Sequence, residues 1–493
     1  MSLRRQMFNR TFRGRVTPED KARNDYFYVP FELPAPARRL TVRYHYSARM
    51  HHGQREGGNV IDIGLFGPEG AHFPGGAGFR GWSGSDRLTF TVGREEATPG
   101  YLPGPLPAGR YQVILGLYRI WAEGADYEIE VQAELAETAG DAAWAGPRVD
   151  VDRLEPAPDD GGEEWLWLKG DLQSHTYHSD GKGSPAYLAS KARALGLDFL
   201  AITDHNTVSH HAALAELSDE QLLLIPGQEV TTYYGHMNVW GASRWCDFRC
   251  RSDEEMAALI ALAHAHGGLC SINHPKEGGP AWTYGLDLPV DALEVWQGPW
   301  PHRNEESLAL WERLLNEGRR VPVVGGSDYH CPSESQGRSG ETGFLRLGQP
   351  TTWVRARGRD AGAVLEAIRA GRTSISALPD GPRLDLRAGA GGKGDVVQMG
   401  QALRLDAGRE ARVTVEAVGG DGLILRLATE AGVAHEEKVQ GAAQRVVVTL
   451  PAERYIRAEL VGDMAAEDLP PQAPADLDLR GWRWALTNPI YID

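Results

Sequence analysis

Histidines and carboxylates follow a series of short apolar runs in the middle of this sequence. Residues 171–181 read Asp-Leu-Gln-Ser-His-Thr-Tyr-His-Ser-Asp-Gly and come directly after the apolar run 165–168. Five further polar side chains, each close behind or within a later strand-like run, are Glu229, His236, His274, Asp328 and His330. Imidazole and carboxylate donors together suit zinc, manganese or iron better than calcium or copper. The pattern predicts one to three divalent transition-metal ions.

The apolar runs alternate with helical stretches, which is typical of parallel βα units. Ser184 and Pro185 form an N-cap and first-turn signal, and Ser252 with Glu255 forms a capping box. Counting strand-helix pairs gives about seven over residues 165–377, which favours a (βα)7 barrel. The carboxyl ends of barrel strands meet at one face, so we expect all the metal-binding side chains to converge there.

Both flanks of this segment contain short alternating strands and no helical period. Residues 25–150 are predicted to form a β-sandwich, and residues 378–493 a second β-rich or β-sandwich domain. The stretch 151–164 is acidic and contains proline and glycine, so we expect a linker that proteases cut first. The arginine-rich residues 1–24 are expected to be a solvated basic tail.

Composition narrows the class of partner. Lys and Arg number 51 against 67 Asp and Glu, giving a net charge of −16, so nucleic acid is not a favoured partner. The 4 cysteines do not form a disulfide framework and are expected to be free thiols. No secretory signal and no apolar run of membrane-spanning length is visible. We expect a cytoplasmic protein that acts on a small molecule away from membranes; the oligomeric state is left open.

Six motifs in order give the central segment, about residues 166–376, its resemblance to a known family. They are Gly170-Asp-Leu-Gln-Ser-His-Thr-Tyr-His-Ser-Asp-Gly, Ile202-Thr-Asp-His-Asn, Gly227-Gln-Glu-Val-Thr-Thr, Gly235-His-Met-Asn-Val-Trp-Gly, Asn273-His-Pro with Leu293-Glu-Val-Trp, and Gly325-Gly-Ser-Asp-Tyr-His. The segment resembles the PHP (polymerase and histidinol phosphatase) superfamily, and within it the carbaryl-hydrolase-like CehA/McbA branch. The resemblance implies a distorted (βα)7 barrel and metal-dependent hydrolysis, most often of phosphoesters.

The resemblance also implies three metal positions. His175, Glu229 and Asp328 would hold the first, and Glu229 would bridge to a second held by His236 and His274. A third would lie near His205 and His330, with Asp180 or His178. The residues expected to be catalytic are Glu229, Asp328, His205 and His330.

One position departs from the family pattern. The family motif opens His-x-His, whereas this chain has Gln173-Ser-His175. A glutamine carbonyl oxygen would bind zinc less well than an imidazole, relative to harder cations. Gln173 could be a weak ligand, stand behind a water molecule, or only bond a neighbouring loop.

Several other polar residues have a structural alternative to a functional role. Asp204 is expected to hydrogen-bond a ligand imidazole, with a turn residue as the alternative. The side chains that could hold an anionic substrate, or be isolated surface charges, are Lys276, Arg303 and Arg338. His210 and His211 are expected to face solvent.

Together these observations predict a phosphoesterase that uses hydroxide generated at a metal centre. A carbamate or carboxylic-ester hydrolase of the same fold is a close alternative. A non-catalytic protein with a decayed metal site, whose β domains bind carbohydrate or protein, is the alternative from another class.

Overall fold

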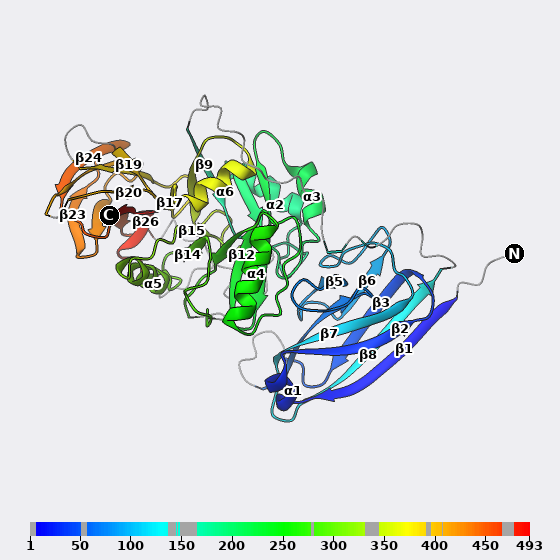
Figure 1. Ribbon diagram of the computed structural model, residues 1–493. Coiled ribbons are helices and arrows are strands. Elements are labelled where there is room, and N and C mark those ends of the chain that lie inside the picture. Colours follow the sequence, from blue (N-terminus) through cyan, green and yellow to red (C-terminus); the bar gives the residue numbers. More distant parts are fainter. Residues whose placement is uncertain are drawn as a thin grey trace.

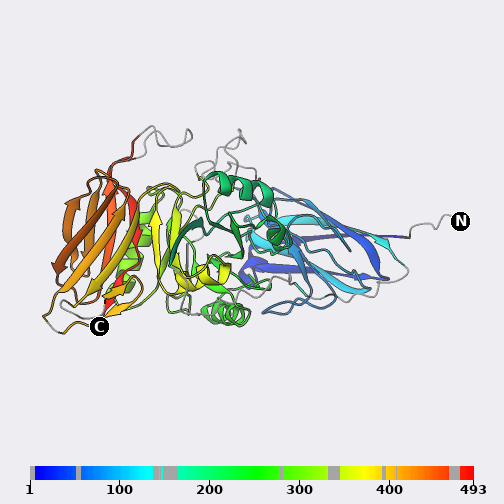
Figure 2. The same ribbon diagram turned by 90° about the horizontal axis from the view of Figure 1, so that it is seen from above.

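The structure is a computed structural model. It describes residues 6–50, 57–136, 144, 146–147, 165–277, 281–330, 345–390, 396–406, 408–465 and 478–493. Two groups of sheets lie at opposite ends of a central part that carries most of the helices (Figures 1 and 2). In the part of the chain described, no helix is long and apolar enough to cross a membrane. The linker expected at 151–164 lies outside the described residues.

The N-terminal sheets (residues 7–135) are two four-stranded antiparallel sheets, ordered β1-β8-β3-β6 and β2-β7-β4-β5. Their strands are β1 (Met7–Val16), β2 (Tyr26–Leu33), β3 (Ala37–Tyr46), β4 (Val60–Phe66), β5 (Phe79–Trp82), β6 (Thr89–Gly93), β7 (Gly109–Arg119) and β8 (Ala125–Leu135). Alternate residues of β3, namely Leu40, Val42 and Tyr44, point into one core shared by both sheets. Such alternation is what a half-buried strand requires.

The expectation that residues 1–24 form a solvated tail is wrong for residues 7–23. β1 pairs with β8 along its whole length, and helix α1 (Pro18–Arg23) follows, capped by Thr17. The basic side chains of β1 are exposed, and Arg15 pairs with Asp126 at 2.6 Å. These arginines therefore belong to an edge strand. The basic composition of the segment suggested a tail and did not reveal that strand.

The central segment (residues 166–376) contains a curled mixed sheet. Its strands are β9 (Leu166–Asp171), β10 (Phe199–Ile202), β11 (Leu223–Thr232), β12 (Gly235–Trp240), β13 (Leu269–Ile272), β14 (Ala292–Gln297), β15 (Val323–Gly326), β16 (Thr351–Ala356) and β17 (Thr373–Ser376). Its helices are α2 (Pro185–Ala194), α3 (His211–Leu217), α4 (Asp253–Ala265), α5 (Asn304–Asn316) and α6 (Ala361–Arg369). Strands β9-β10-β11 and β13-β14-β15 are parallel, and the other neighbours are antiparallel.

The strand pairings therefore do not form the regular (βα)7 barrel that was expected. Within the described central segment there are only five helices. β11 and β12 form a hairpin, because the turn at Tyr233 and Tyr234 leaves no room for a helix between them. The sheet nevertheless curls round: just beyond β9 and β15, Ser174 and Tyr329 form a parallel bridge. This closeness brings the ends of distant strands to one place.

The C-terminal sheets (residues 383–492) are continuous with the central segment. Their strands are β18 (Arg383–Gly389), β19 (Val396–Gln398), β20 (Ala402–Leu403), β21 (Ala411–Val418), β22 (Ile424–Thr429), β23 (Gly432–Lys438), β24 (Ala443–Leu450), β25 (Tyr455–Gly462), β26 (Trp482–Thr487) and β27 (Ile490–Ile492). One sheet has the order β19-β18-β21-β24, whereas β26, β25, β22 and β23 extend the central sheet. The connection is the antiparallel pairing of β17 with β26, as in Ser374 opposite Thr487.

Candidate metal centre

Glu229, on β11, stands at the middle of a group of histidines. Its side chain is fully buried. Oε1 lies 3.1 Å from His236 Nδ1 and 3.3 Å from His274 Nε2. Oε2 lies 3.4 Å from His175 Nε2 and 3.0 Å from His205 Nδ1. Each carboxylate oxygen therefore faces a different pair of imidazoles.

Two groups of potential ligands share Glu229. One consists of His175, Glu229 and Asp328, and the other of Glu229, His236 and His274; within each, one donor atom per residue lies within 4.8 Å of the others. His175 Nε2 is 2.9 Å from Asp328 Oδ1. Donor atoms around a tetrahedral zinc ion with bonds near 2.0–2.1 Å are about 3.3 Å apart. The observed separations suit a cation enclosed by either group.

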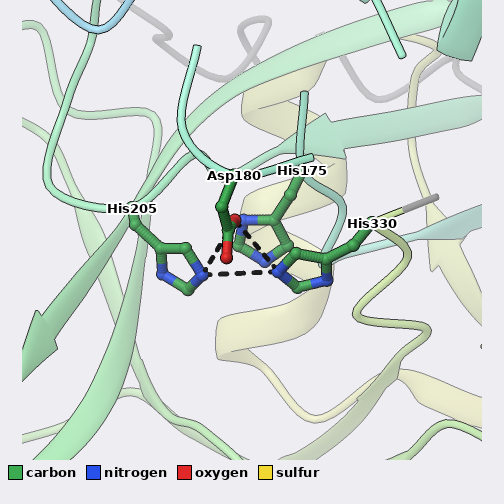
Figure 3. A group of neighbouring side chains, drawn as sticks. All are labelled: His175, Asp180, His205 and His330. Carbon is green, nitrogen blue, oxygen red and sulfur yellow. Dashed lines mark hydrogen bonds and ion pairs between the residues drawn. The ribbon is translucent and has the colours of Figure 1, made fainter. Parts of the chain in front are cut away.

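A third group contains His175, Asp180, His205 and His330 (Figure 3). Asp180 Oδ1 lies 3.3 Å from His330 Nε2 and 3.6 Å from His205 Nε2. The other nitrogen of each imidazole is already occupied: His330 Nδ1 is 2.7 Å from the Asp328 carbonyl oxygen, and His205 Nδ1 is 2.6 Å from Thr231 Oγ1. Because the Asp328 carbonyl can only accept a hydrogen bond, it places the proton of a neutral His330 ring on Nδ1 and leaves Nε2 to bind a cation.

Several buried polar atoms of these groups have no hydrogen-bond partner among the described residues. They include Nδ1 of His175 and Nε2 of His236. Nε2 of His175 and Oε2 of Glu229 do lie within 3.4 Å of a carboxylate or an imidazole, but in a geometry unsuited to a hydrogen bond. A buried polar atom without a partner costs about 1–3 kcal/mol, so native interiors rarely keep one. The donor types and the missing partners together fit a metal ion.

In the two groups that share Glu229, the charges of the side chains also suit a cation. Burial alone would raise the pKa of Glu229, but His205 and His236 hold it well below its usual range. Against the same effect of burial, His330 and His175 keep the pKa of Asp328 low. Burial lowers the pKa of both His175 and His236. Ionised carboxylates and neutral imidazoles are the forms that bind metals.

In the third group, Asp180 overcomes the effect of burial and raises the pKa of His205 to about 9 and that of His330 well above its usual range. These two rings would therefore release a proton on binding a metal ion.

The backbone is unusual at two of the ligands. His274 has φ 29° and Asp328 has φ 53°, in the left-handed region that non-glycine residues seldom adopt. Beside Asp328, a Cβ on Gly326 would lie 2.7 Å from the Gln173 Cβ, so β15 can approach β9 this closely only with glycine there. Residues held in rare conformations cluster at functional sites.

Gln173 lies inside the first group. Its Nε2 donates to Glu229 Oε1 at 3.1 Å and to Asp328 Oδ1 at 3.2 Å, while its Oε1 is buried without a partner. Gln173 therefore contacts the ligands themselves rather than a neighbouring loop. Amide oxygen and nitrogen can exchange places by a simple flip. Whether Gln173 binds a cation directly stays a prediction.

Asp204 and His178 have positions different from those expected. Asp204 accepts hydrogen bonds from the hydroxyls of Thr176 and Ser179, both at 2.6 Å, and lies 3.2 Å from His210. Burial would raise the pKa of Asp204, but His210 and His178 lower it to about 2. Asp204 thus holds a loop and not a ligand imidazole. His178 Nδ1 is 2.8 Å from Ser209 Oγ, outside the three groups.

The basic side chains that could hold an anionic substrate already have partners within the protein, where the structure describes them. Lys276 Nζ donates to the Gln297 carbonyl at 3.1 Å, to Asn304 Oδ1 at 2.8 Å and to the His302 carbonyl, and burial lowers its pKa to about 7. Arg303 pairs at the surface with Glu277 and Glu306, at 2.7 and 2.6 Å. Arg338 lies outside the described residues. These contacts favour structural roles for Lys276 and Arg303.

Sequence reasoning misplaced two histidines and missed one carboxyl group. His210 and His211 are buried rather than solvent-facing, with Nε2 atoms 3.0 Å from the Ile202 carbonyl and 2.8 Å from the Gly227 carbonyl. Glu294 is buried, and its Oε2 accepts the backbone N–H of His274 at 3.0 Å. The glutamate inside the apolar Leu293-Glu-Val-Trp run was the available signal, because a charge in a buried strand needs a reason.

Comparisons with known proteins give weak resemblances. No family model matches the chain, and no curated protein does. A two-domain protein from Bacteroides vulgatus, described as containing a predicted PHP-like metal-dependent phosphoesterase, is 17% identical with a TM-score of 0.36, covering 69% of this chain and all of that one. A putative metal-dependent phosphoesterase from Bifidobacterium adolescentis is 19% identical with a TM-score of 0.29, covering 40% of this chain and 94% of that one. An amidohydrolase from Chromobacterium violaceum is 16% identical with a TM-score of 0.26, covering 33% and 88%. Similarity this low leaves function to be argued from the side chains.

Proposed function

We propose that this chain is a metal-dependent hydrolase of the PHP superfamily, in its carbaryl-hydrolase-like branch, and that it cleaves a small anionic phosphoester. The observation that carries the proposal is the position of Glu229. Its two oxygens face two separate pairs of imidazoles, which is the arrangement of a carboxylate that joins two cations.

Different residues of the chain would hold the two cations and fix the bridging carboxylate. His175 and Asp328 would hold one cation with Glu229, and His236 with His274 would hold the other. Asn273 donates to Glu229 Oε1 at 3.0 Å and fixes the carboxylate. When bound, such cations lower the pKa of water and neutralise charge that develops on the substrate's oxygens. No serine nucleophile is needed.

Asp180 and His205 are the most exposed of the potential ligands, with side chains 48% and 21% exposed, whereas His175 is fully buried. They therefore face the side from which a substrate enters. Three cation positions around one opening can engage several oxygens of a phosphoryl group, which favours a phosphoester. Carbamates and carboxylic esters present fewer such oxygens and are the alternative substrates.

Hydrolysis of a substrate panel tests the proposal. Phosphomonoesters, phosphodiesters, carbamates and aryl esters are compared with added manganese, zinc or iron, using wild type and His274→Ala. His435→Ala is the control, because His435 pairs with Glu437 in the C-terminal sheets, outside every group of potential metal ligands among the described residues. We expect phosphoesterase activity in wild type and the control, and loss in His274→Ala. Activity on carbamates or carboxylic esters alone would correct the substrate class, and no hydrolysis by metal-loaded wild type would contradict the proposal.

A further inference from the structure

Asp180 differs from the other potential ligands in how the fold supports it. His175, His205 and His330 come within a few residues of the ends of β9, β10 and β15. Asp180 lies further along the chain, on the loop 176–183, and its side chain is 48% exposed. Only contacts made by this loop can therefore hold Asp180 beside His205 and His330.

One side of the loop is held by the central segment. Asp204 accepts the backbone N–H of Thr176 at 2.8 Å and that of Ser179 at 3.2 Å. The backbone N–H of Lys182 donates to the His330 carbonyl at 2.7 Å. These bonds fix both ends of the loop but do not contact the Asp180 side chain.

The other side of the loop is held by the N-terminal sheets. Arg87 donates through Nη1 to the Ser179 carbonyl at 3.1 Å and through Nη2 to the Tyr177 carbonyl. Asp86 forms an ion pair with Lys182 at 3.0 Å. A planar guanidinium with two nitrogens on two carbonyls restrains orientation as well as position. Arg87 thus restrains the backbone of the loop immediately before Asp180.

A second contact comes from Gly100, after β6. Its N–H donates to Ser209 Oγ at 3.0 Å, and its carbonyl accepts the Thr207 hydroxyl at 3.0 Å. Gly100 has φ +96°, and a Cβ there would lie 2.8 Å from the His178 carbonyl oxygen. The N-terminal sheets therefore fit closely against both the Asp180 loop and the residues that follow His205.

The hairpin that carries Glu229 and His236 makes a third contact. At its tip, Tyr233 donates to Asp62 Oδ2 at 2.7 Å and Tyr234 donates to Asp25 Oδ2 at 2.8 Å. Nearby, the rings of Phe79 and Trp245 stack with centroids 3.8 Å apart. The N-terminal sheets therefore contact two separate parts of the metal centre, the Asp180 loop and the hairpin.

We infer that the N-terminal sheets are a working part of the metal centre, and that Arg87 is a positioning residue that holds Asp180 in the third metal position. The inference rests on the proposed function for what the centre does. The placement of Arg87 against the loop does not depend on that function, because it is given by the hydrogen bonds of Arg87. Without Arg87, Asp204 still anchors Thr176 and Ser179, so the fold remains while the loop gains freedom around Asp180.

The test compares full-length wild type, Arg87→Ala and Arg87→Lys. Arg43→Ala is the control, because Arg43 is an exposed arginine of the same sheets that bonds only Gln132 among its described contacts. Hydrogen exchange is measured first on metal-free protein. In Arg87→Ala we expect the amides of Tyr177, Ser179 and Lys182 to exchange about tenfold faster or more, which is about 1.4 kcal/mol of local opening. Arg87→Lys should restore part of the protection.

Manganese titration followed by electron paramagnetic resonance is the second measurement. We expect Arg87→Ala to weaken the third position by about 10- to 100-fold and to leave the two positions at Glu229 unchanged. Unchanged exchange in the loop, or equal weakening of all positions, would overturn the inference. If wild type binds no metal while the loop of Arg87→Ala still exchanges faster, the proposed function fails and the role of Arg87 stands.

Discussion

His205 and Glu229 face each other across neighbouring strands: their backbones form a parallel bridge, and His205 Nδ1 lies 3.0 Å from Glu229 Oε2. The opposite oxygen of Glu229 faces His236 and His274. One buried carboxylate therefore connects all three groups of potential ligands. A change at Glu229 should disturb the whole centre rather than a single position.

Glu229→Gln should lower the affinity for the two cations that Glu229 joins and reduce hydrolysis by about 100-fold or more, since even residues behind metal ligands commonly contribute 10- to 100-fold. A neutral amide keeps the shape of the side chain, so circular dichroism should be unchanged. Elemental analysis and turnover are the measurements. Near-wild-type turnover with full metal content would show that Glu229 is not a bridge.

Gln173→His introduces the first histidine of the His-x-His pattern at a side chain that contacts both Glu229 and Asp328. An imidazole would add a nitrogen donor to the first group, so we expect its metal affinity to rise by roughly 10- to 100-fold. Gln173→Leu is the matched variant, because it removes the amide and adds no donor. Calorimetric titration of metal-free proteins measures both. Identical isotherms for wild type and Gln173→His would show that this position does not influence the metal.

Arg303→Ala should leave the KM for substrate within about twofold. The side chain is 46% exposed and already paired with Glu277 and Glu306, so its charge is engaged within the protein rather than directed at the metal centre. Steady-state kinetics on the best substrate of the panel measures the effect. A tenfold rise in KM would instead support substrate binding by Arg303.

Glu459 predicts a pH dependence of stability in the C-terminal sheets. Burial would raise its pKa, but Arg457 and Arg483 lower it from 4.5 to about 2. A depressed carboxyl pKa stabilises the fold above the unfolded value, and that contribution, on the order of 3 kcal/mol, is lost as the pH falls from about 5 towards 2. Glu459→Gln should therefore be less stable than wild type at pH 7.

Urea unfolding at several pH values checks this. The difference in unfolding free energy between wild type and Glu459→Gln should shrink between pH 5 and pH 3. A difference that stays constant over this range would mean that the ionisation of Glu459 does not contribute.

Local sequence signals predicted the elements that carry the site. Ser184 caps α2 and Ser252 caps α4, as expected from their side chains and the residues that follow. The histidines and carboxylates at strand ends do come together, because strands that curl into one sheet bring their ends to one edge.

Contacts between residues that lie far apart in the sequence could not be predicted from local signals. The β11–β12 hairpin and the pairing of β17 with β26 depend on which strands meet, and a strand's own residues do not specify its partner. Lys276 resembled a surface cation because its acceptors, Gln297 and Asn304, lie some 20 to 30 residues away in sequence. No sequence motif pointed to a role for Arg87, since its acceptors are backbone carbonyls in another part of the fold.

The central claim is that Glu229 joins two metal positions, and anomalous scattering from crystals soaked in manganese tests it most directly. We predict two strong peaks, each about 2.0–2.2 Å from a different Glu229 oxygen, one beside His175 and Asp328 and the other beside His236 and His274. A map with a peak beside only one of the two oxygens, or beside neither, at saturating manganese would contradict the claim.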